Sequence, residues 1–543
     1  MPQHLARKSR PASSLGATIL IWIVALVLSI PAPVSAQQLV KPAAPRPRGE
    51  GEGPFEKLII RGATLIDGTG APPRGPVDIV IERNHITQVV DVGFPNVPID
   101  SSKRPKGATK EIDAQGMYVM PGFVDLHLHT GEVPKAPEAE YVYKLWMAHG
   151  VTAGRGVPFG PLDWSVSEKA RSAKNEITAP RMFVYDVPNN DWLGAGFKSP
   201  EEVRTVVRAM KQKGADGLKL SAWPPDLMAA AIDEATKLGM GTTAHLAQLG
   251  VPRMNAMEAA RLGLGTVTHF YGLFEAMYDS NQVQPYPDTY NYNDEQWRFG
   301  QVARQASLVT PRSKKWMALL DTLKAHNVTL DPTQVAYLAG RDVVRRRSAE
   351  WHDAYTLPSL TDFYTPNRTN HGAYFFNWTT WDEVAWKNFF RVWHILLNDY
   401  KNMGGRVTVS TDAGFIYNTY GFATVEEMEM LQEAGFHPLE VIRAATLHAA
   451  ETLFRPTGKP IEFGVVRPGM LADIVVAPEN PVANLKTLYG TGFVRLNDKT
   501  GKVERVGGIK YTIKDGIIYD ARKLLADVAA MVDKQKKARG VAQ

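Results

Sequence analysis

The sequence predicts an α/β protein: a (β/α)8 TIM barrel with a small β-sandwich domain formed from the N- and C-terminal segments. Two observations lead to this prediction. Between residues 121 and 455, short apolar runs alternate with amphipathic helical stretches, which is typical of a parallel sheet covered by helices. Residues 57–120 and 456–525 instead carry short runs of β-strand character. Two β-rich flanks around a long middle segment predict one composite β domain.

The composition is that of a large globular protein. The chain has 543 residues, more than the roughly 250–300 at which single domains usually stop growing. It has no cysteine, which excludes disulfides, thiolate metal ligands and cysteine nucleophiles. Much of the net charge of +6 comes from the first 50 residues. No later stripe of Lys and Arg with interleaved aromatic residues follows, so nucleic acid is not an expected partner.

The N-terminus has the pattern of a bacterial-type signal peptide over residues 1–36. Lys8 and Arg10 precede an apolar run at 17–28, and small residues lead to Ala36. An uncleaved membrane anchor is the alternative, but the run is shorter than the roughly 20 residues that a spanning helix needs. We therefore expect a periplasmic or secreted protein with no stable membrane insertion after cleavage.

The segments beside the barrel are predicted in order. Residues 37–56 are rich in Pro and Gly and have the composition of a linker. Residues 58–68 predict a strand and a turn, and 77–90 predict a hairpin that turns at Arg83-Asn84. Strands at 473–477 and 509–519 would complete the composite domain, and residues 526–543 would form a C-terminal helical tail.

The middle segment, 121–455, supplies the eight units that a closed barrel requires. We expect its strands near residues 123–129, 151–155, 182–186, 217–221, 241–246, 266–270, 328–334 and 406–412. Expected helices include 201–213, 225–238 and 256–262. The segments 271–325 and 335–405 are long and rich in Trp and Tyr, so we expect lids over the barrel mouth. The same aromatic residues could instead pack a dimer interface, which makes a homo-oligomer possible.

Two histidines share the first barrel strand. Residues i and i+2 of a strand point to the same face, so His127 and His129 can present two imidazoles side by side. Two structural histidines are the alternative, but the preceding Pro121-Gly122-Phe123 and Asp125 make a functional pair the better interpretation.

Two further histidines each close a predicted strand. His245 ends the run 241–245 and His269 ends the run 266–269, 24 residues later, which is about one β/α unit. A lone histidine in such a place is more often structural. Barrel active sites form where the strands end, so two histidines in register with the earlier pair predict one site.

An aspartate and a lysine complete the candidate site. Asp412 lies at the end of the last predicted strand, where it could hold a metal and take a proton from water, or form a simple turn. Lys219 lies in the fourth strand, and a lysine there is usually solvated or ion-paired. Its ammonium would be repelled by divalent cations, so it can act as a ligand only when neutral or as the carbamate formed with CO2.

These residues resemble a known family. The pattern His127-x-His129, Lys219, His245, His269 and Asp412 resembles, in this order, the binuclear metal set of the amidohydrolase superfamily. Residues 62–70 and 463–476 resemble its opening and closing β segments, and the similarity runs from about 58 to 520. Within the superfamily, the sequence looks most like the branch of imidazolonepropionase- and prolidase-like amidohydrolases. The segment 148–156 and the two aromatic insertions depart from the family pattern.

The resemblance implies a mechanism. His127, His129 and Asp412 would hold one divalent metal, His245 and His269 a second, and carboxylated Lys219 would bridge the two. Imidazole and carboxylate ligands suit Zn²⁺, with Mn, Co or Ni as alternatives. Asp412 and Lys219 would be the catalytic residues, with Asp412 passing a proton to the leaving nitrogen.

The expected reaction is hydrolysis of a C–N bond in a small molecule: an amide, a lactam or a dipeptide. Tyr271 could bind the substrate or merely pack. Phosphotriester or ester hydrolysis on the same site is the second possibility, and a non-catalytic scaffold the third.

Overall fold

A computed structural model describes residues 39–133, 135–247, 250–278, 294–368, 371–375 and 377–540. The predicted signal peptide therefore lies outside the described residues. Among the helices that are described, none combines the length and the apolar character needed to cross a bilayer.

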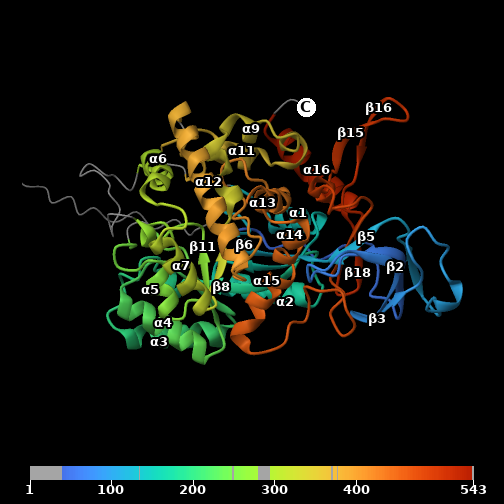
Figure 1. Cartoon of the computed structure of the whole chain (residues 1–543), viewed down its shortest axis with the longest axis horizontal. Helices are drawn as coiled ribbons and strands as arrows, with labels where there is room; N and C mark the ends of the chain where they lie inside the picture. The colour runs from blue at the N-terminus through green and yellow to red at the C-terminus, as the bar shows by residue number, and fades with distance from the viewer. Residues whose placement is uncertain are drawn as a thin grey trace, which may run out of the picture. The chain divides into compact units, whose positions relative to one another are not determined.

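The eight predicted barrel strands are confirmed. They form one parallel sheet whose strand order follows the chain, and Figure 1 labels β6, β8 and β11 of this sheet among the surrounding helices. Its members are β6 (Phe123–Leu128), β7 (Val151–Gly156), β8 (Arg181–Asp186), β9 (Gly217–Leu220), β10 (Gly241–Ala244), β11 (Thr266–Thr268), β12 (Thr329–Asp331) and β13 (Arg406–Val407). Leu126 N donates to Val409 O at 3.2 Å and Asp412 N to His127 O at 3.0 Å. These bonds join β6 to the segment after β13, so the sheet curls in a TIM-like manner.

Helices separate the barrel strands along the chain. They are α1 (Ala139–Ala148), α2 (Leu162–Ala173), α3 (Pro200–Lys213), α4 (Pro225–Lys237), α5 (Ala256–Arg261), α7 (Lys314–Ala325) and α12 (Thr380–Asn402), followed by α13 (Phe422–Glu433), α14 (Pro438–Ala444) and α15 (Leu447–Phe454). The start of α3 shows why they form. Ser199 caps it and Pro200 takes the first position, both favoured there. The three helices predicted at 201–213, 225–238 and 256–262 correspond to α3, α4 and α5.

Both ends of the chain contribute to a second sheet. Its strands are β1 (Leu58–Leu65), β2 (Arg74–Glu82), β3 (His85–Asp91), β4 (Lys110–Asp113), β5 (Tyr118–Pro121), β14 (Ile474–Ala477), β17 (Tyr511–Lys514) and β18 (Ile517–Asp520). Strand β14 pairs antiparallel with β5, which joins the C-terminal segment to the N-terminal one. The hydrogen bonding gives one eight-stranded sheet, so the two-layer sandwich stays a prediction. A separate hairpin consists of β15 (Phe493–Asn497) and β16 (Lys502–Val506).

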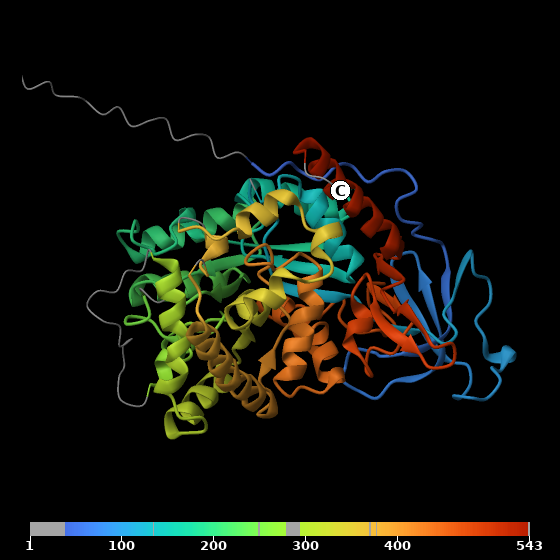
Figure 2. The same ribbon diagram turned by 90° about the horizontal axis from the view of Figure 1, so that it is seen from above.

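Residues 39–56, which composition predicts to be a linker, lie against the barrel. Arg46 N donates to Glu176 O at 2.8 Å, and Glu52 and Ile518 form a β-bridge. We call this segment the strap. Figure 2 shows it beside α16 (Ala521–Ala538), the last helix, and Lys523 of α16 contacts Gly49 O. The helical tail expected from residue 526 begins earlier, because the Asp520 side chain caps the helix at Ala521.

The two aromatic insertions, residues 271–325 and 335–405, contribute both barrel helices and shorter elements. Helices α7 and α12 directly precede β12 and β13 in the chain, the position of ordinary barrel helices. The shorter elements are α6 (Glu295–Ala303), α8 (Leu338–Arg341), α9 (Val343–Arg347), α10 (His352–Tyr355) and α11 (Pro358–Tyr364). Three side chains of α6 line the central cavity described below. The lids over the barrel mouth stay a prediction, whereas α7 and α12 take the place of barrel helices.

Candidate metal centre

One cavity of about 450 Å³ contains every side chain that the sequence analysis selected. Its lining includes His127, His129, Lys219, His245, His269, Tyr271 and Asp412. His127 and Lys219 lie on β6 and β9, and His245, His269 and Asp412 each lie just beyond the carboxyl end of a strand. Five barrel strands thus bring together residues spread over nearly 300 positions of the chain.

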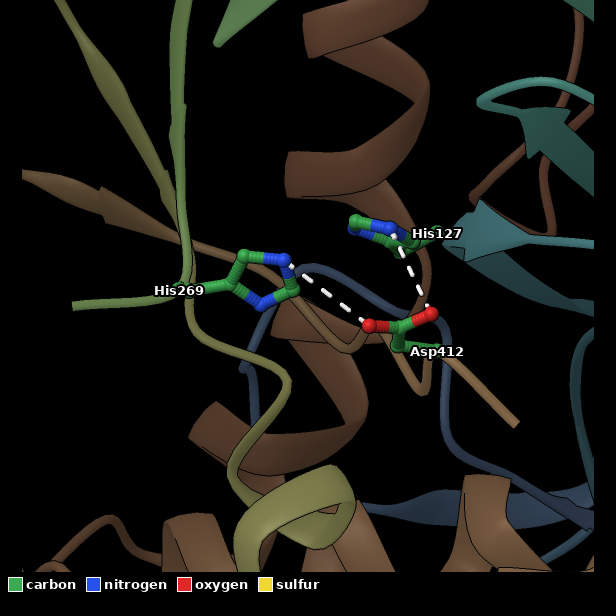
Figure 3. A group of neighbouring side chains, drawn as sticks. All are labelled: His127, His269 and Asp412. Carbon is green, nitrogen blue, oxygen red and sulfur yellow. Dashed lines mark ion pairs between the residues drawn. The ribbon is translucent and has the colours of Figure 1, made fainter. Parts of the chain in front are cut away.

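Asp412 lies between three imidazoles. Its Oδ1 is 3.2 Å from His129 Nε2 and 3.7 Å from His127 Nε2, and its Oδ2 is 3.8 Å from His269 Nε2. Figure 3 shows the carboxylate facing His127 and His269 from below. One donor atom from each of His127, His269 and Asp412 lies within 4.8 Å of the other two. This spacing suits three ligands around one cation.

His245 lies on the other side of His269. The centroids of the His245 and His269 rings are 4.6 Å apart. Tyr271 stacks on His245 with centroids 4.5 Å apart and an interplanar angle of 10°. The stacking gives Tyr271 a packing role whether or not it also meets a substrate.

Lys219 is a buried amine in the same cavity. Only 3% of the residue is exposed, and its Nζ has no hydrogen-bond partner among the described residues. Burial lowers the pKa of Lys219 to about 8, although the carboxylates of Asp412 and Asp331 oppose the shift. An amine that loses its proton this readily can become a ligand or react with CO2.

His127, His269 and Asp412 have pKa values shifted toward the states that bind metals. Burial lowers the pKa of His127 and of His269 well below the usual value, and the nearby Lys219 adds to the effect. Burial alone would raise the pKa of Asp412, but His127 and His129 outweigh it and hold that pKa below its usual value. Neutral imidazole and ionised carboxylate are the states that coordinate a cation.

Three residues at this site have strained backbones. His269 has φ 65°, Asp412 has φ 49° and Thr333 has φ 50°. A non-glycine residue in this left-handed region costs on the order of 1–3 kcal/mol, and such residues cluster at active sites. The strain is held by neighbours: Asp412 N donates to His127 O, and His269 N donates to Asp331 O at 2.8 Å.

Asp125 ties two parts of the site together. Its Oδ1 accepts from His127 N and from Thr411 N, each at 3.1 Å. Burial raises the pKa of Asp125 to about 7. His129 has its own support, because its Nδ1 donates to Pro158 O at 2.8 Å and leaves Nε2 toward Asp412. Asp125 stands in the motif that contains His127 and His129, but the sequence pattern alone predicts no role for it.

Two charged residues beneath the cavity were missed. Arg155 of β7 and Asp331 of β12 are both fully buried and form an ion pair. Asp331 ends an apolar strand in the same manner as His245 and His269, so the signal used for the histidines could have found it. Other cavity-lining residues were also missed: Trp192, Glu295, Arg298, Phe299, Tyr337 and Phe415.

A parallel barrel with imidazole, carboxylate and amine groups gathered at the carboxyl ends of its strands has the arrangement of a barrel enzyme. Residues 118–518 match the model of the Amidohydrolase family. The chain belongs to this family.

Curated relatives resemble part of the chain. The N-acyl-D-aspartate deacylase of Alcaligenes xylosoxydans xylosoxydans is 29% identical over 151 residues, 27% of each chain. Urease subunit alpha of Streptococcus thermophilus (strain CNRZ 1066) is 31% identical over 164 residues, 30% of this chain and 26% of the urease chain. This chain therefore spans about a quarter of the length of either relative.

Solved structures share the fold over most of the chain. A Xaa-Pro dipeptidase with bound methionine aligns with a TM-score of 0.55 and 16% identity, covering 86% of this chain and 100% of the other. Bottromycin amidohydrolase aligns with a TM-score of 0.58 and 19% identity, covering 89% and 91%. At these identities the likeness concerns the fold.

Proposed function

We propose that this protein hydrolyses a C–N bond of an amide, a lactam or a dipeptide-like small molecule at a binuclear metal centre. One observation carries the proposal. Four imidazoles, one carboxylate and one buried amine, in the order that the amidohydrolase resemblance implies, line a single cavity at the strand ends.

The side chains fit a pair of divalent cations. The donor set is entirely nitrogen and oxygen, and three of its atoms already lie within 4.8 Å of one another. The buried Lys219 Nζ without a hydrogen-bond partner is a costly feature, and carboxylation would convert it into a bridging anion. His127, His129 and Asp412 would hold one metal, His245 and His269 the other, and zinc is the expected ion.

When bound, the metals would lower the pKa of water and polarise the scissile carbonyl. Asp412 is placed to accept the proton of the attacking water and to deliver it to the leaving nitrogen. The Tyr271 hydroxyl accepts from the Tyr337 hydroxyl at 3.4 Å, and Tyr271 lines the same cavity, where it would help to orient the substrate. Aromatic side chains around the cavity, including Trp192, Phe299 and Phe415, favour a substrate with a bulky apolar group.

The test is a substrate screen on reconstituted protein. Metal-depleted protein is loaded with Zn²⁺, with and without bicarbonate, and assayed on N-acyl amino acids, dipeptides and lactams. An aryl phosphotriester and a carboxylic ester are assayed in parallel. We expect turnover of the C–N substrates. Turnover of the phosphotriester or ester alone would support that alternative reaction, and no metal binding at all would support the scaffold.

Two variants sharpen the screen. Asp412→Asn should lower kcat by about 10²–10⁴, the usual contribution of general acid–base catalysis. His127→Ala should bind less metal and lose activity. His326→Ala is the matched control, because His326 is an exposed residue at the end of α7. Metal-loaded His127→Ala or Asp412→Asn with near wild-type kcat would refute the assignment.

We also propose that the protein is exported to the periplasm or secreted. The basis is the charged, then apolar, then small-residue pattern of residues 1–36. Cell fractionation together with N-terminal sequencing tests this, and a cytoplasmic protein that retains Met1 would overturn it. A homo-oligomer stays a possibility that a sedimentation measurement decides.

A further inference from the structure

A buried ion pair lies directly beneath the cavity. Asp331 Oδ2 accepts from Arg155 Nη2 at 2.5 Å and from Thr268 Oγ1 at 3.0 Å. Arg155 Nε also donates to Leu126 O at 2.8 Å. Both charged side chains are fully buried. The pair therefore connects β6, β7, β11 and β12 inside the barrel.

Stability alone is a poor explanation for this pair. Removing two charges from water is expensive, and replacing a buried ion pair with apolar residues of similar volume is often neutral or stabilising. The interior of a barrel is normally filled by branched apolar side chains. A charged pair in this place therefore calls for another role.

Asp331 contacts two of the proposed metal ligands. Its Oδ2 is 3.8 Å from His127 Nδ1, and this Nδ1 has no hydrogen-bond partner among the described residues. The other ring nitrogen, Nε2, faces Asp412 Oδ1 at 3.7 Å. The His127 ring thus stands between two carboxylates, one on the cavity side and one beneath it. In addition, the main-chain carbonyl of Asp331 accepts from His269 N at 2.8 Å.

We propose that Asp331 is a positioning residue of the metal centre and that Arg155 holds it in place. The Asp331 carboxylate faces Nδ1 of His127 across 3.8 Å and so favours the tautomer with its proton on Nδ1, which would leave the Nε2 lone pair for a metal. Its carbonyl sets the strained backbone of His269 at the same time. A carboxylate behind a metal-binding histidine orients the ring and raises its basicity, and losing such a partner typically lowers metal affinity 10–100-fold.

This inference rests on the proposed metal centre, so its test measures metal binding rather than turnover. The full chain is depleted of metal and titrated with Zn²⁺ against a chromophoric chelator, and separately with Co²⁺ while its visible absorption is recorded. The variants are Asp331→Asn and the double variant Arg155→Met with Asp331→Leu. The double variant removes both charges of the pair, so neither partner is left unpaired, and its metal binding can be measured even if the single variant fails to fold.

The matched control is Asp473→Asn. Asp473 is also buried and also pairs with an arginine, Arg181 at 3.4 Å, but Arg181 begins β8, at the end of the strand opposite to the cavity. We expect a 10–100-fold loss of Zn²⁺ affinity and an altered Co²⁺ spectrum in both Asp331 variants. In the control we expect wild-type metal binding with a lower melting temperature.

The outcomes separate the two proposals. Wild-type Zn²⁺ affinity and Co²⁺ spectrum in the folded double variant would overturn the role of Asp331 and leave the proposed function intact. Wild-type protein that binds metal but hydrolyses no C–N substrate would overturn the proposed function, while the binding data would still decide on Asp331. Wild-type protein that binds no metal would overturn both.

Discussion

At the scale of single residues, burial acts in opposite directions on the two catalytic candidates. It lowers the pKa of Lys219 to about 8 because an ammonium loses its hydration. Burial would raise the pKa of Asp412, but the neighbouring His127 and His129 reverse the effect. One cavity therefore keeps an ionised carboxylate beside an amine that is close to losing its proton. This combination suits a site that must gather two cations.

Replacing Lys219 with Met tests the amine. The substitution keeps most of the buried aliphatic stem, so the fold should survive. We expect fewer than two equivalents of bound Zn²⁺ and no response of activity to bicarbonate, because no carbamate can form. Atomic emission on gel-filtered protein measures the metal, and wild-type protein treated in parallel is the reference. Two tightly bound equivalents together with full activity in Lys219→Met would contradict the bridging role.

The pKa of Lys219 also predicts how CO2 activates the metal-free protein. Only the neutral amine reacts with CO2. With a pKa of about 8, the neutral fraction rises steeply up to about pH 8 and then levels off. An unperturbed lysine, near pKa 10.4, would continue to gain reactivity through pH 10. Metal-free protein is incubated at each pH with the same dissolved CO2, then loaded with Zn²⁺ and assayed at one common pH. A continued rise through pH 10 would contradict the shift.

At the scale of elements, the side chains at the strand ends could be predicted from the sequence. The contacts that fix the loops after the strands could not. His129, His245 and His269 each follow the last residue of a buried barrel strand, so the pattern of short strand-like runs indicated their place at the barrel mouth. Glu427 was missed, because its role depends on partners far away in the chain. Glu427 lies on α13 in a run of glutamates that usually face solvent. Yet it is buried and accepts from Gln334 N at 3.1 Å and Val335 N at 2.7 Å.

The Glu427 contact predicts a combined effect on stability and substrate binding. Glu427→Leu leaves the two backbone N–H groups of Gln334 and Val335 without partners. Since each of the two unsatisfied buried groups costs about 1–3 kcal/mol, we expect a loss of roughly 2–6 kcal/mol in the free energy of unfolding. We also expect a higher KM, because Ala336 and Tyr337 of the same turn line the cavity. Denaturant titration and steady-state kinetics measure the two effects.

Glu433→Gln is the control on the same helix. Glu433 is 42% exposed and pairs with Arg341 at 2.8 Å, and such a surface pair contributes at most about 1 kcal/mol. If Glu427→Leu were no less stable than Glu433→Gln, the carboxylate would not be holding the turn.

At the scale of the whole molecule, the two ends of the chain meet beside the barrel. Strand β14 joins β5, and the strap lies along α1 and α16. The composite sheet could be predicted from its strand-like runs, but the strap could not. Its Pro- and Gly-rich composition indicates a segment that builds no core, and indeed Ala43 and Glu50 are its only buried residues among positions 39–56. It is fixed by backbone hydrogen bonds and one buried ion pair, which composition does not reveal.

That ion pair makes the strap part of the folded body. Glu50 and Lys144 of α1 are 7% and 5% exposed, with 2.8 Å between Oε2 and Nζ, and Lys144 also contacts Asp527 of α16 at 2.9 Å. Breaking a buried pair from one side usually costs about 3–5 kcal/mol. We expect Glu50→Ala to lose about 3 kcal/mol in the free energy of unfolding, the low end of this range, because Lys144 keeps Asp527 and Glu140 as partners.

Denaturant titration of three variants tests this prediction. Glu138→Ala removes the exposed partner of Lys41, a pair with side chains 39% and 69% exposed, and should change the free energy by less than about 1 kcal/mol. Glu50→Ala combined with Lys144→Met should be more stable than Glu50→Ala alone. The double variant also removes the buried Lys144 ammonium, which the single variant leaves without its Glu50 partner. If Glu50→Ala and Glu138→Ala lost the same free energy of unfolding, the strap would lie on the barrel without stabilising it. Residues 39–56 would then be better described as the linker that their composition predicts.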